Sequence, residues 1–277
     1  MRKTLLAALV TAGAAVLAPV ASAITNGEPD GGRHPYVGLA VFEDDGVATR
    51  RCSAALLSAT LVLTAGHCTS GADTARIWVD ESVQDNPEYP GRGATSYDGV
   101  PYTAPGFCVE CGDGATAVVV RDVGVVVLSE PVPTEVVSRY AELPDAWLVD
   151  TLPGETPVDI VGYGVQANVG GPNEPRWTGL RARYYAPSEI DAPGTYPNAE
   201  EFVRLSPDRS ERHGGTCFGD SGAPDLARGT DTVLAVNSYV LNSTCAGDAY
   251  SQRVDIPEVL DWIGSFAEEA VPVAAAR

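Results

Sequence analysis

The sequence predicts an all-β protein that ends in a single α-helix. Short runs rich in β-branched residues alternate with clusters of Gly, Pro, Asn and Asp, the pattern of strands separated by turns. The runs that we predict as strands are residues 36–41, 54–63, 117–120, 123–128, 158–163, 180–185 and 232–240. Helical periodicity is clear only near the end of the chain, over residues 256–270.

The predicted helix is amphipathic. Its apolar face is formed by Ile256, Val259, Leu260, Ile263 and Phe266, which recur every three or four residues. Asp255 precedes it as a capping residue, and Pro257 stands in its first turn, where proline is tolerated. Residues 271–277 show no periodicity, and we expect them to form a flexible tail.

A cluster of prolines divides the chain into two halves. Four prolines fall between residues 131 and 155, which we predict as a linker joining residues 24–130 to residues 156–255. The chain after residue 23 has a length that all-β enzymes fill as one compact unit. It leaves no room for a second, unrelated domain.

The first 23 residues have the features of an export signal. Arg2 and Lys3 precede an apolar run over residues 5–20, and the small residues Ala21 and Ala23 fit a cleavage site before Ile24. The run is shorter than the roughly 20 apolar residues of a membrane span. We therefore expect a secreted, extracellular protein that keeps no membrane segment after cleavage.

The cysteine count supports an oxidising compartment. All six cysteines follow the predicted signal, and an even number in an exported protein predicts disulfides, although six cysteines allow fifteen pairings. A zinc site is the alternative. One Cys-x-x-Cys and only three histidines in the chain argue against it, so we expect no metal.

The chain is strongly acidic. Its formal net charge is −19, and loss of Arg2 and Lys3 with the signal makes it −21. Nucleic acid is therefore not an expected partner. The acidity fits either a well-solvated surface or an attraction for basic substrates.

Three motifs supply the groups of a nucleophilic hydrolase. They are Thr64-Ala-Gly-His67-Cys68, Arg121-Asp122-Val-Gly-Val and Gly219-Asp-Ser221-Gly222, in the order His, Asp, Ser. A serine hydroxyl needs a base that takes its proton during attack on an amide, and an imidazole oriented by a carboxylate supplies one. We predict Ser221 as nucleophile, His67 as base and Asp122 as the group that orients it.

These motifs resemble those of the chymotrypsin/trypsin-like serine proteases, where Thr-Ala-Ala-His-Cys, Asp-Ile-Ala-Leu and Gly-Asp-Ser-Gly-Gly-Pro occur in the same order. The resemblance implies two antiparallel six-stranded β-barrels, with His67 and Asp122 on the first and Ser221 on the second. It also implies a secreted serine endopeptidase that works through an acyl-enzyme intermediate without a cofactor. Its partners would be protein or peptide substrates, a protein inhibitor would be a further possible partner, and the enzyme would be a monomer.

The same resemblance assigns further roles. It pairs Cys52 with Cys68 and Cys217 with Cys245, which leaves Cys108 and Cys111 as the third pair. The backbone N–H groups of Gly219 and Ser221 would bind the oxyanion. Ser238, Tyr239 and Val240 would pair with an extended substrate, and Ser238 would also bond to Asp122.

The resemblance also implies how the mature enzyme is activated. Cleavage after Ala23 would create an ammonium at Ile24, and this ammonium would insert beside Asp220 and order the oxyanion loop. Loss of its proton at alkaline pH would then lower activity.

Residue preference at the cut bond stays open in the sequence. Gly215 occupies the position at which trypsin has its pocket aspartate, and Val240 replaces a glycine of the pocket wall. We therefore favour small or medium apolar residues before the cut bond. A different gap placement would bring Asp248 to the pocket floor and select Arg or Lys, and bulky aromatic residues are the third option.

A catalytically inactive, protease-shaped binding protein is the rival function. Such proteins usually lose the histidine or serine of the triad, whereas His67, Asp122 and Ser221 are all present here. His34 does not belong to any of the motifs, and we expect it on the surface.

Overall fold

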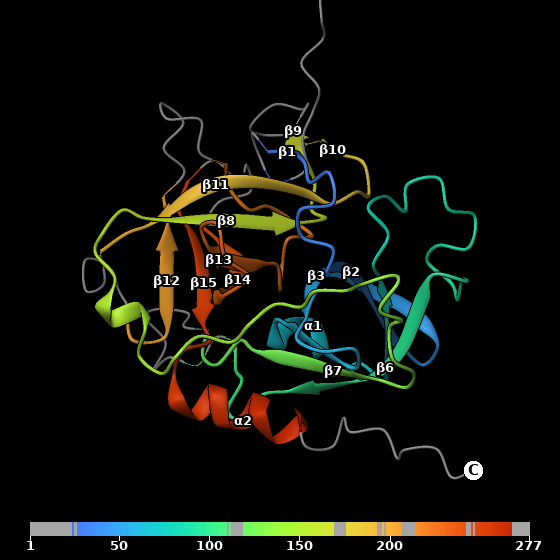
Figure 1. Cartoon of the computed structure of the whole chain (residues 1–277), viewed down its shortest axis with the longest axis horizontal. Helices are drawn as coiled ribbons and strands as arrows, with labels where there is room; N and C mark the ends of the chain where they lie inside the picture. The colour runs from blue at the N-terminus through green and yellow to red at the C-terminus, as the bar shows by residue number, and fades with distance from the viewer. Residues whose placement is uncertain are drawn as a thin grey trace, which may run out of the picture.

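The computed structural model describes residues 24, 27–109, 111, 119–168, 176–192, 196, 198–206, 214–241, 245 and 247–267. The predicted signal, residues 1–23, and the predicted tail, residues 271–277, lie outside these described residues. Two β-barrels lie side by side, with a helix beneath them (Figure 1). Within the described part of the chain, no helix has the length and apolar character needed to cross a bilayer.

The first barrel is closed by six antiparallel strands. They are β2 (Val37–Asp44), β3 (Val47–Leu56), β4 (Leu61–Thr64), β5 (Thr74–Trp78), β6 (Ser96–Thr103) and β7 (Gly124–Leu128). They pair in the order β2-β3-β4-β7-β6-β5, and β5 returns to β2. The short helix α1 (Gly66–Thr69) follows β4 after one residue, Ala65.

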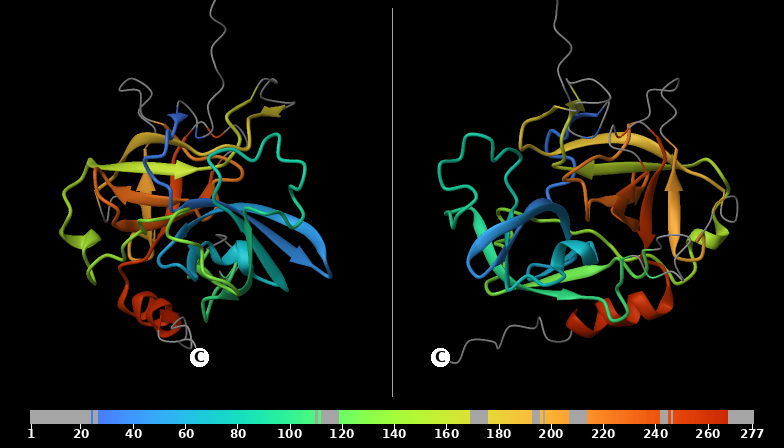
Figure 2. Two further views of the ribbon diagram at one scale, coloured as in Figure 1. Left: turned by 45° about the vertical axis from the view of Figure 1, so that its right-hand side comes forward. Right: turned by 180° about the vertical axis from the view of Figure 1, so that it is seen from behind.

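The second barrel is also closed by six antiparallel strands. They are β8 (Thr156–Gly162), β11 (Tyr184–Ile190), β12 (Phe202–Leu205), β13 (Pro224–Ala227), β14 (Val233–Val240) and β15 (Ala249–Arg253). The ring closes because β8 pairs with β11 on one side and with β13 on the other. Rotated views keep the blue-to-green strands of the first barrel apart from the yellow-to-red strands of the second (Figure 2).

Four small elements lie outside the two rings of strands. Strand β1 (Glu28–Pro29) pairs with β11, β9 (Ala167–Asn168) pairs with β10 (Trp177–Thr178), and η1 (Val149–Thr151) is a single 3-10 turn. The prediction of two six-stranded antiparallel barrels followed by a C-terminal helix is confirmed.

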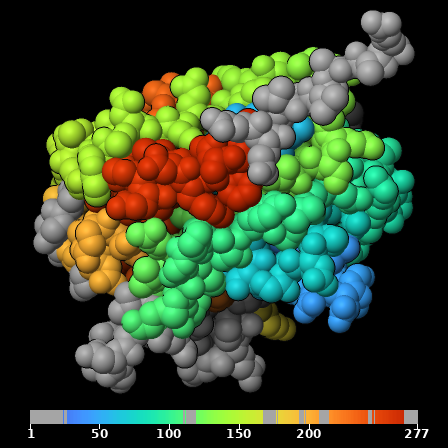
Figure 3. All heavy atoms as spheres, turned by 90° about the horizontal axis from the view of Figure 1, so that it is seen from below, coloured from blue at the N-terminus to red at the C-terminus, as the bar shows by residue number. Residues whose placement is uncertain are grey.

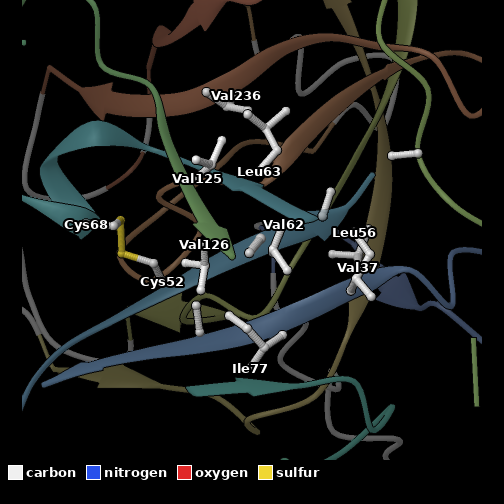
Figure 4. Close-up of a cluster of buried hydrophobic side chains, with 14 of the residues drawn as sticks. Val37, Cys52, Leu56, Val62, Leu63, Cys68, Ile77, Val125, Val126 and Val236 are labelled. Carbon is white, nitrogen blue, oxygen red and sulfur yellow. A yellow bond between two sulfur atoms is a disulfide. The ribbon is translucent and has the colours of Figure 1, made fainter. Parts of the chain in front are cut away.

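An apolar core joins the two barrels. Val62 and Leu63 of β4 pack with Val125 and Val126 of β7 beside the Cys52–Cys68 disulfide (Figure 4). Val236 of β14 belongs to the same buried cluster although it comes from the second barrel. Full burial of each such side chain contributes about 1.5–3 kcal/mol, so the barrels share a large part of their stabilisation.

Helix α2 (Pro257–Ala267) returns from the second barrel to the first. Val259 and Ile263 are buried in the cluster that includes the first barrel's core, and the Phe266 ring lies 4.9 Å from that of Tyr102 in β6. Seen from below, α2 (red) lies on the surface against the yellow-green segment between the barrels (Figure 3). The apolar face that the sequence pattern predicts is therefore the face by which α2, which follows the second barrel, packs on the first.

Several strands differ from the sequence predictions. Five of the twelve barrel strands were not predicted: β5, β6, β12, β13 and β15. Strand β6 contains Gly99 and Pro101 and is largely half-exposed, and β15 is polar yet fully buried, so neither shows the usual apolar alternation. The strand predicted over 180–185 begins at Tyr184 instead. Of the run 117–120, the described part shows only an isolated bridge between Val120 and Cys108.

His34 is not on the surface as predicted, since it is only 8% exposed. Its Nδ1 lies 2.6 Å from Asp30 Oδ1, and Arg183 Nε lies 3.0 Å from the other oxygen of the same carboxylate. Burial raises the pKa of Asp30, but the His34 hydrogen bonds and the Arg183 charge outweigh it and lower the pKa to about 2. This network fixes the segment before β2 against the start of β11.

A Gly222→Ala substitution should destabilise the protein far more than Gly46→Ala. Both glycines have positive φ, +77° and +74°, so alanine is strained by about 1 kcal/mol or more at either position. At Gly222 the added Cβ would also overlap the Thr64 hydroxyl and the Ser53 carbonyl, whereas nothing lies within 4 Å at Gly46. We expect a further loss of about 1–3 kcal/mol in the free energy of unfolding by urea. Equal losses would contradict this packing.

Candidate active site

His67 is carried by the short helix α1 at the end of β4. The Cys52–Cys68 disulfide ties α1 to β3. Gly66 allows α1 to approach the segment before β7, because a Cβ there would lie 3.0 Å from the Val123 carbonyl oxygen. The local sequence thus brings His67 next to the residues that precede β7.

Asp122 lies two residues before the start of β7 and is only 1% exposed. Its Oδ1 accepts a hydrogen bond from the His67 backbone N–H at 2.7 Å, and its Oδ2 lies 2.8 Å from His67 Nδ1. The Ser238 hydroxyl donates to the same Oδ2. The backbone N–H of Asp122 donates to Gln252 Oε1 at 2.9 Å. The carboxylate is therefore held from both barrels.

Ser221 lies in a tight turn between Gly219 and Gly222, whose φ angles are +96° and +77°. Its carbonyl oxygen accepts a hydrogen bond from the Ser53 N–H at 2.8 Å, and the Ser53 hydroxyl donates to the Gly219 carbonyl at 2.9 Å. Gly222 faces Thr64 at the end of β4. The serine turn of the second barrel is thereby fastened to β3 and β4 of the first.

A pocket of about 180 Å³ opens beside Ser221. Its walls come from the serine turn and from β14. They are formed by Cys217, Phe218, Ser221, Asn237, Ser238, Tyr239 and Val240. Ser238 also binds Asp122, and Asp122 binds His67, so hydrogen bonds connect the His67 and Asp122 motifs to the wall of the pocket that Ser221 lines.

Comparison with known proteins agrees with this arrangement. The family model described as Trypsin matches residues 24–263. The chain belongs to the trypsin family. A search of curated proteins finds no match.

Solved structures of low sequence identity share the fold. HL collagenase is 18% identical with a TM-score of 0.66, and the match covers 89% of this chain and 96% of that one. Human heparin binding protein is 19% identical with a TM-score of 0.61, covering 91% and 100%. The inactivated protease paralogue S-I1 of the scabies mite is 18% identical with a TM-score of 0.61, covering 88% and 99%. The trypsin fold is therefore shared by proteins of different function.

Three disulfides link the cysteines of this trypsin-family chain. They join Cys52 to Cys68, Cys108 to Cys111, and Cys217 to Cys245. Disulfides fit an extracellular protein. The last of them anchors the segment before the serine turn to the segment before β15.

Asp220 points away from solvent, into the base of the serine turn, and is fully buried. Its carboxylate accepts hydrogen bonds from the Gly164 N–H at 2.8 Å and the Cys217 N–H at 2.9 Å. Burial raises the pKa of Asp220 to about 7, against the lowering effect of these two donors and of the Arg51 charge. Gly164 makes room for this carboxylate, because a Cβ there would overlap it.

Ile24 is also fully buried, in the core of the second barrel. It packs in one cluster with Val158 and Ile160 of β8 and Ala235 of β14. The residue predicted to begin the mature chain is thus already seated inside the barrel that carries Ser221.

A second buried carboxylate, which sequence reasoning missed, lies in the same barrel. Asp225 of β13 is fully buried and stands opposite Ile160 and Ala235 in the strand pairing, so it faces the core in which Ile24 lies. Neither oxygen has a hydrogen-bond partner among the described residues. Burial raises the pKa of Asp225 to about 7; the Ser251 hydroxyl opposes this shift and the Asp220 charge adds to it.

Two further positioning residues were also missed. Gln252 receives the backbone N–H of Asp122, and Ser53 binds the serine turn from the first barrel. The largely polar sequence of β15 gave no signal for Gln252. Nothing in the local sequence distinguishes Ser53.

The predicted pocket residues separate into two groups. Tyr239 and Val240 line the pocket beside Ser221. Gly215 is buried but is not one of the lining residues. Asp248 does not line the pocket either. Its half-exposed carboxylate lies 3.6 Å from the guanidinium of Arg204.

An Asp225→Asn variant tests the protonation of the buried acid. Because the pKa of Asp225 is about 7 in the folded protein against 3.8 in a solvated chain, the folded state holds an extra proton between these values. The free energy of unfolding should therefore fall as pH rises from 4 to 7 and then level off.

Asparagine does not titrate, so the free energy of unfolding of Asp225→Asn lacks the fall that Asp225 causes in wild type. Relative to wild type, the stability of the variant should therefore increase between pH 4 and pH 8 by up to several kcal/mol. Urea unfolding at both pH values measures the difference. Asp261→Asn on the exposed face of α2 is the matched control and should show no such change. A difference between Asp225→Asn and wild type that does not vary with pH would contradict a protonated Asp225.

Proposed function

We propose that the protein is a secreted serine endopeptidase in which Ser221, His67 and Asp122 form the catalytic triad. The observation that carries the proposal is the chain of contacts from His67 through Asp122 to Ser238, which ends in the pocket that Ser221 lines. Its substrates are proteins or peptides, and it acts as a monomer without a cofactor. Removal of residues 1–23 on export gives the mature enzyme.

His67 acts as base through the ring nitrogen that Asp122 does not occupy. Nδ1 faces Asp122, so Nε2 takes the proton of the Ser221 hydroxyl as the oxygen attacks the carbonyl carbon. His67 then gives this proton to the leaving amine, and water later releases the acyl group by the same route. Asp122 fixes the tautomer and stabilises the imidazolium without taking the proton.

The turn around Ser221 supplies the site for the developing oxyanion. The backbone N–H groups of Gly219 and Ser221 act as donors, and loss of one such donor typically raises the barrier by about 3 kcal/mol. The positive φ of Gly219 supports this role, because a side chain would disfavour that conformation.

Activation follows from the position of Ile24. Cleavage before Ile24 creates an ammonium in the core of the second barrel. We propose that it binds Asp220, which is fully buried and makes no ion pair among the described residues. Breaking a buried ion pair of this kind costs about 3–5 kcal/mol, which is enough to disorder the serine turn.

The pocket favours small or medium apolar residues before the cut bond. Val240 and Tyr239 narrow it, and its volume of about 180 Å³ suits one modest side chain. The alternative of basic specificity through Asp248 is less well supported, because Arg204 already pairs with that carboxylate.

The rival function is binding without catalysis. It is favoured by the fold neighbours, two of which are named as a heparin binding protein and an inactivated protease paralogue. The intact linkage of His67 to Asp122 favours the enzyme.

A serine-directed phosphonate should label the mature protein at Ser221. Ser221→Ala should abolish labelling and lower peptide hydrolysis by on the order of a million-fold, because the nucleophile is lost. Ser265→Ala on exposed α2 should behave as wild type. Intact mass spectrometry measures the label. A folded wild type that is neither labelled nor active would favour the binding protein.

Peptide anilides ending in Ala, Val, Phe and Arg should separate the specificity options. We expect the highest kcat/KM for Ala or Val. Val240→Gly should raise kcat/KM for Phe relative to Ala by about ten-fold or more, because it removes the side chain that narrows the pocket. A wild-type preference for Arg by orders of magnitude would overturn the apolar pocket without affecting the triad.

A further inference from the structure

A second pocket, of about 450 Å³, is lined in part by Gly219 and adjoins the pocket beside Ser221 at Phe218. Residues 48–51 of β3 form one wall, Tyr89 and Pro90 another, and Val165, Phe218 and Gly219 the third. Among the described residues, Phe218 is the one that lines both pockets. We call this second concavity the Arg51 pocket.

The Arg51 pocket is cationic in a protein of net charge −19. Arg50 and Arg51 both line it, and none of the described residues that line it is acidic. Arg50 donates to the Ser70 carbonyl oxygen at 2.5 Å, a contact that leaves its charge uncompensated. A third guanidinium, that of Arg181, lies 5.0 Å from the centre of the Tyr89 ring on the opposite wall.

Arg51 itself is available to a ligand. Its guanidinium has no hydrogen bond and no ion pair within the described part of the chain, whereas most other arginines there bind carboxylates. Its Nη2 would lie 3.7 Å from a Cβ at Gly219, so it stands directly beside the turn that carries Ser221. A guanidinium offers a rigid fork of donors that matches a carboxylate.

The position of the pocket relative to Ser221 fixes which part of a substrate it would meet. In the proposed reaction, the part of the peptide before the cut bond lies along Ser238 to Val240, in the pocket beside Ser221. The part after the cut bond must then leave past Gly219, toward the first barrel. An extended residue spans about 3.3–3.6 Å, so the first two residues after the cut bond come within reach of Arg51.

We propose that Arg51, supported by Arg50, forms a subsite that selects Asp or Glu at the first or second position after the cut bond. This inference rests on the proposed endopeptidase function and adds to it a preference for acidic residues after the cut bond. The apolar walls, which include Val165 and Phe218, lower the local dielectric and strengthen the attraction between guanidinium and carboxylate. Arg51 is a specificity residue and takes no part in proton transfer.

The test uses matched peptides with one fixed sequence before the cut bond. The first or the second residue after it is Glu, Gln or Lys, and kcat/KM is measured by mass spectrometry. We expect wild type to cleave the Glu peptide roughly three- to ten-fold faster than the Gln peptide in at least one of the two positions. Arg51→Gln should bring the ratio close to one, and Arg51→Glu should favour Lys.

Each ratio compares two substrates of the same enzyme, so a change in the overall rate does not affect it. Arg139→Gln is the matched control, because it also removes one positive charge but lines neither pocket, and it should keep the wild-type ratio. Cleavage of all peptides with a Glu-to-Gln ratio of one at both positions would refute the Arg51 subsite alone. Absence of any cleavage would refute the proposed function and the subsite together.

Discussion

The buried carboxylate of Asp122 is the point on which the arrangement of both barrels depends. A carboxylate that is 1% exposed costs several kcal/mol unless donors surround it, and here the donors come from distant parts of the chain. His67 of the first barrel donates its backbone N–H, and Ser238 of the second donates its hydroxyl. Satisfying this one group therefore requires α1, β14 and the segment before β7 to meet.

Ser53 of the first barrel holds the serine turn of the second barrel in a similar way. Its backbone N–H binds the Ser221 carbonyl, its hydroxyl donates to the Gly219 carbonyl, and it accepts the Tyr163 N–H at 2.9 Å. The Thr64 hydroxyl in turn donates to its carbonyl oxygen at 2.9 Å. One small residue of β3 thus satisfies backbone groups of the serine turn that would otherwise be buried without partners. This explains why Gly222 faces the end of β4 with no space for a side chain.

Sequence reasoning reached the parts of this structure that local patterns encode. The fold class and the helix at residue 257 follow from residue spacing and from three short motifs. It missed what depends on partners far away in the chain: Gln252 lies 130 residues from Asp122, and polar β15 reads as a loop until its partners are known. Asp225 was missed because a carboxylate facing a barrel core contradicts the expectation that strands bury apolar side chains.

The net charge of the protein and the local charge beside the serine turn have opposite signs. A net charge of −19 repels acidic ligands, but at physiological ionic strength this repulsion decays over about 8 Å and mainly keeps the protein soluble. At contact distance an acidic ligand is attracted instead of repelled. Arg51 lines a pocket beside the serine turn, whereas Asp220 and Asp225 are buried and do not reach the surface. Burial raises the pKa of both carboxyl groups to about 7, so near neutral pH they are only partly ionised, and in the mature enzyme the proposed Ile24 ammonium balances the charge of Asp220. A ligand that reaches Gly219 therefore meets a positive surface on an acidic protein.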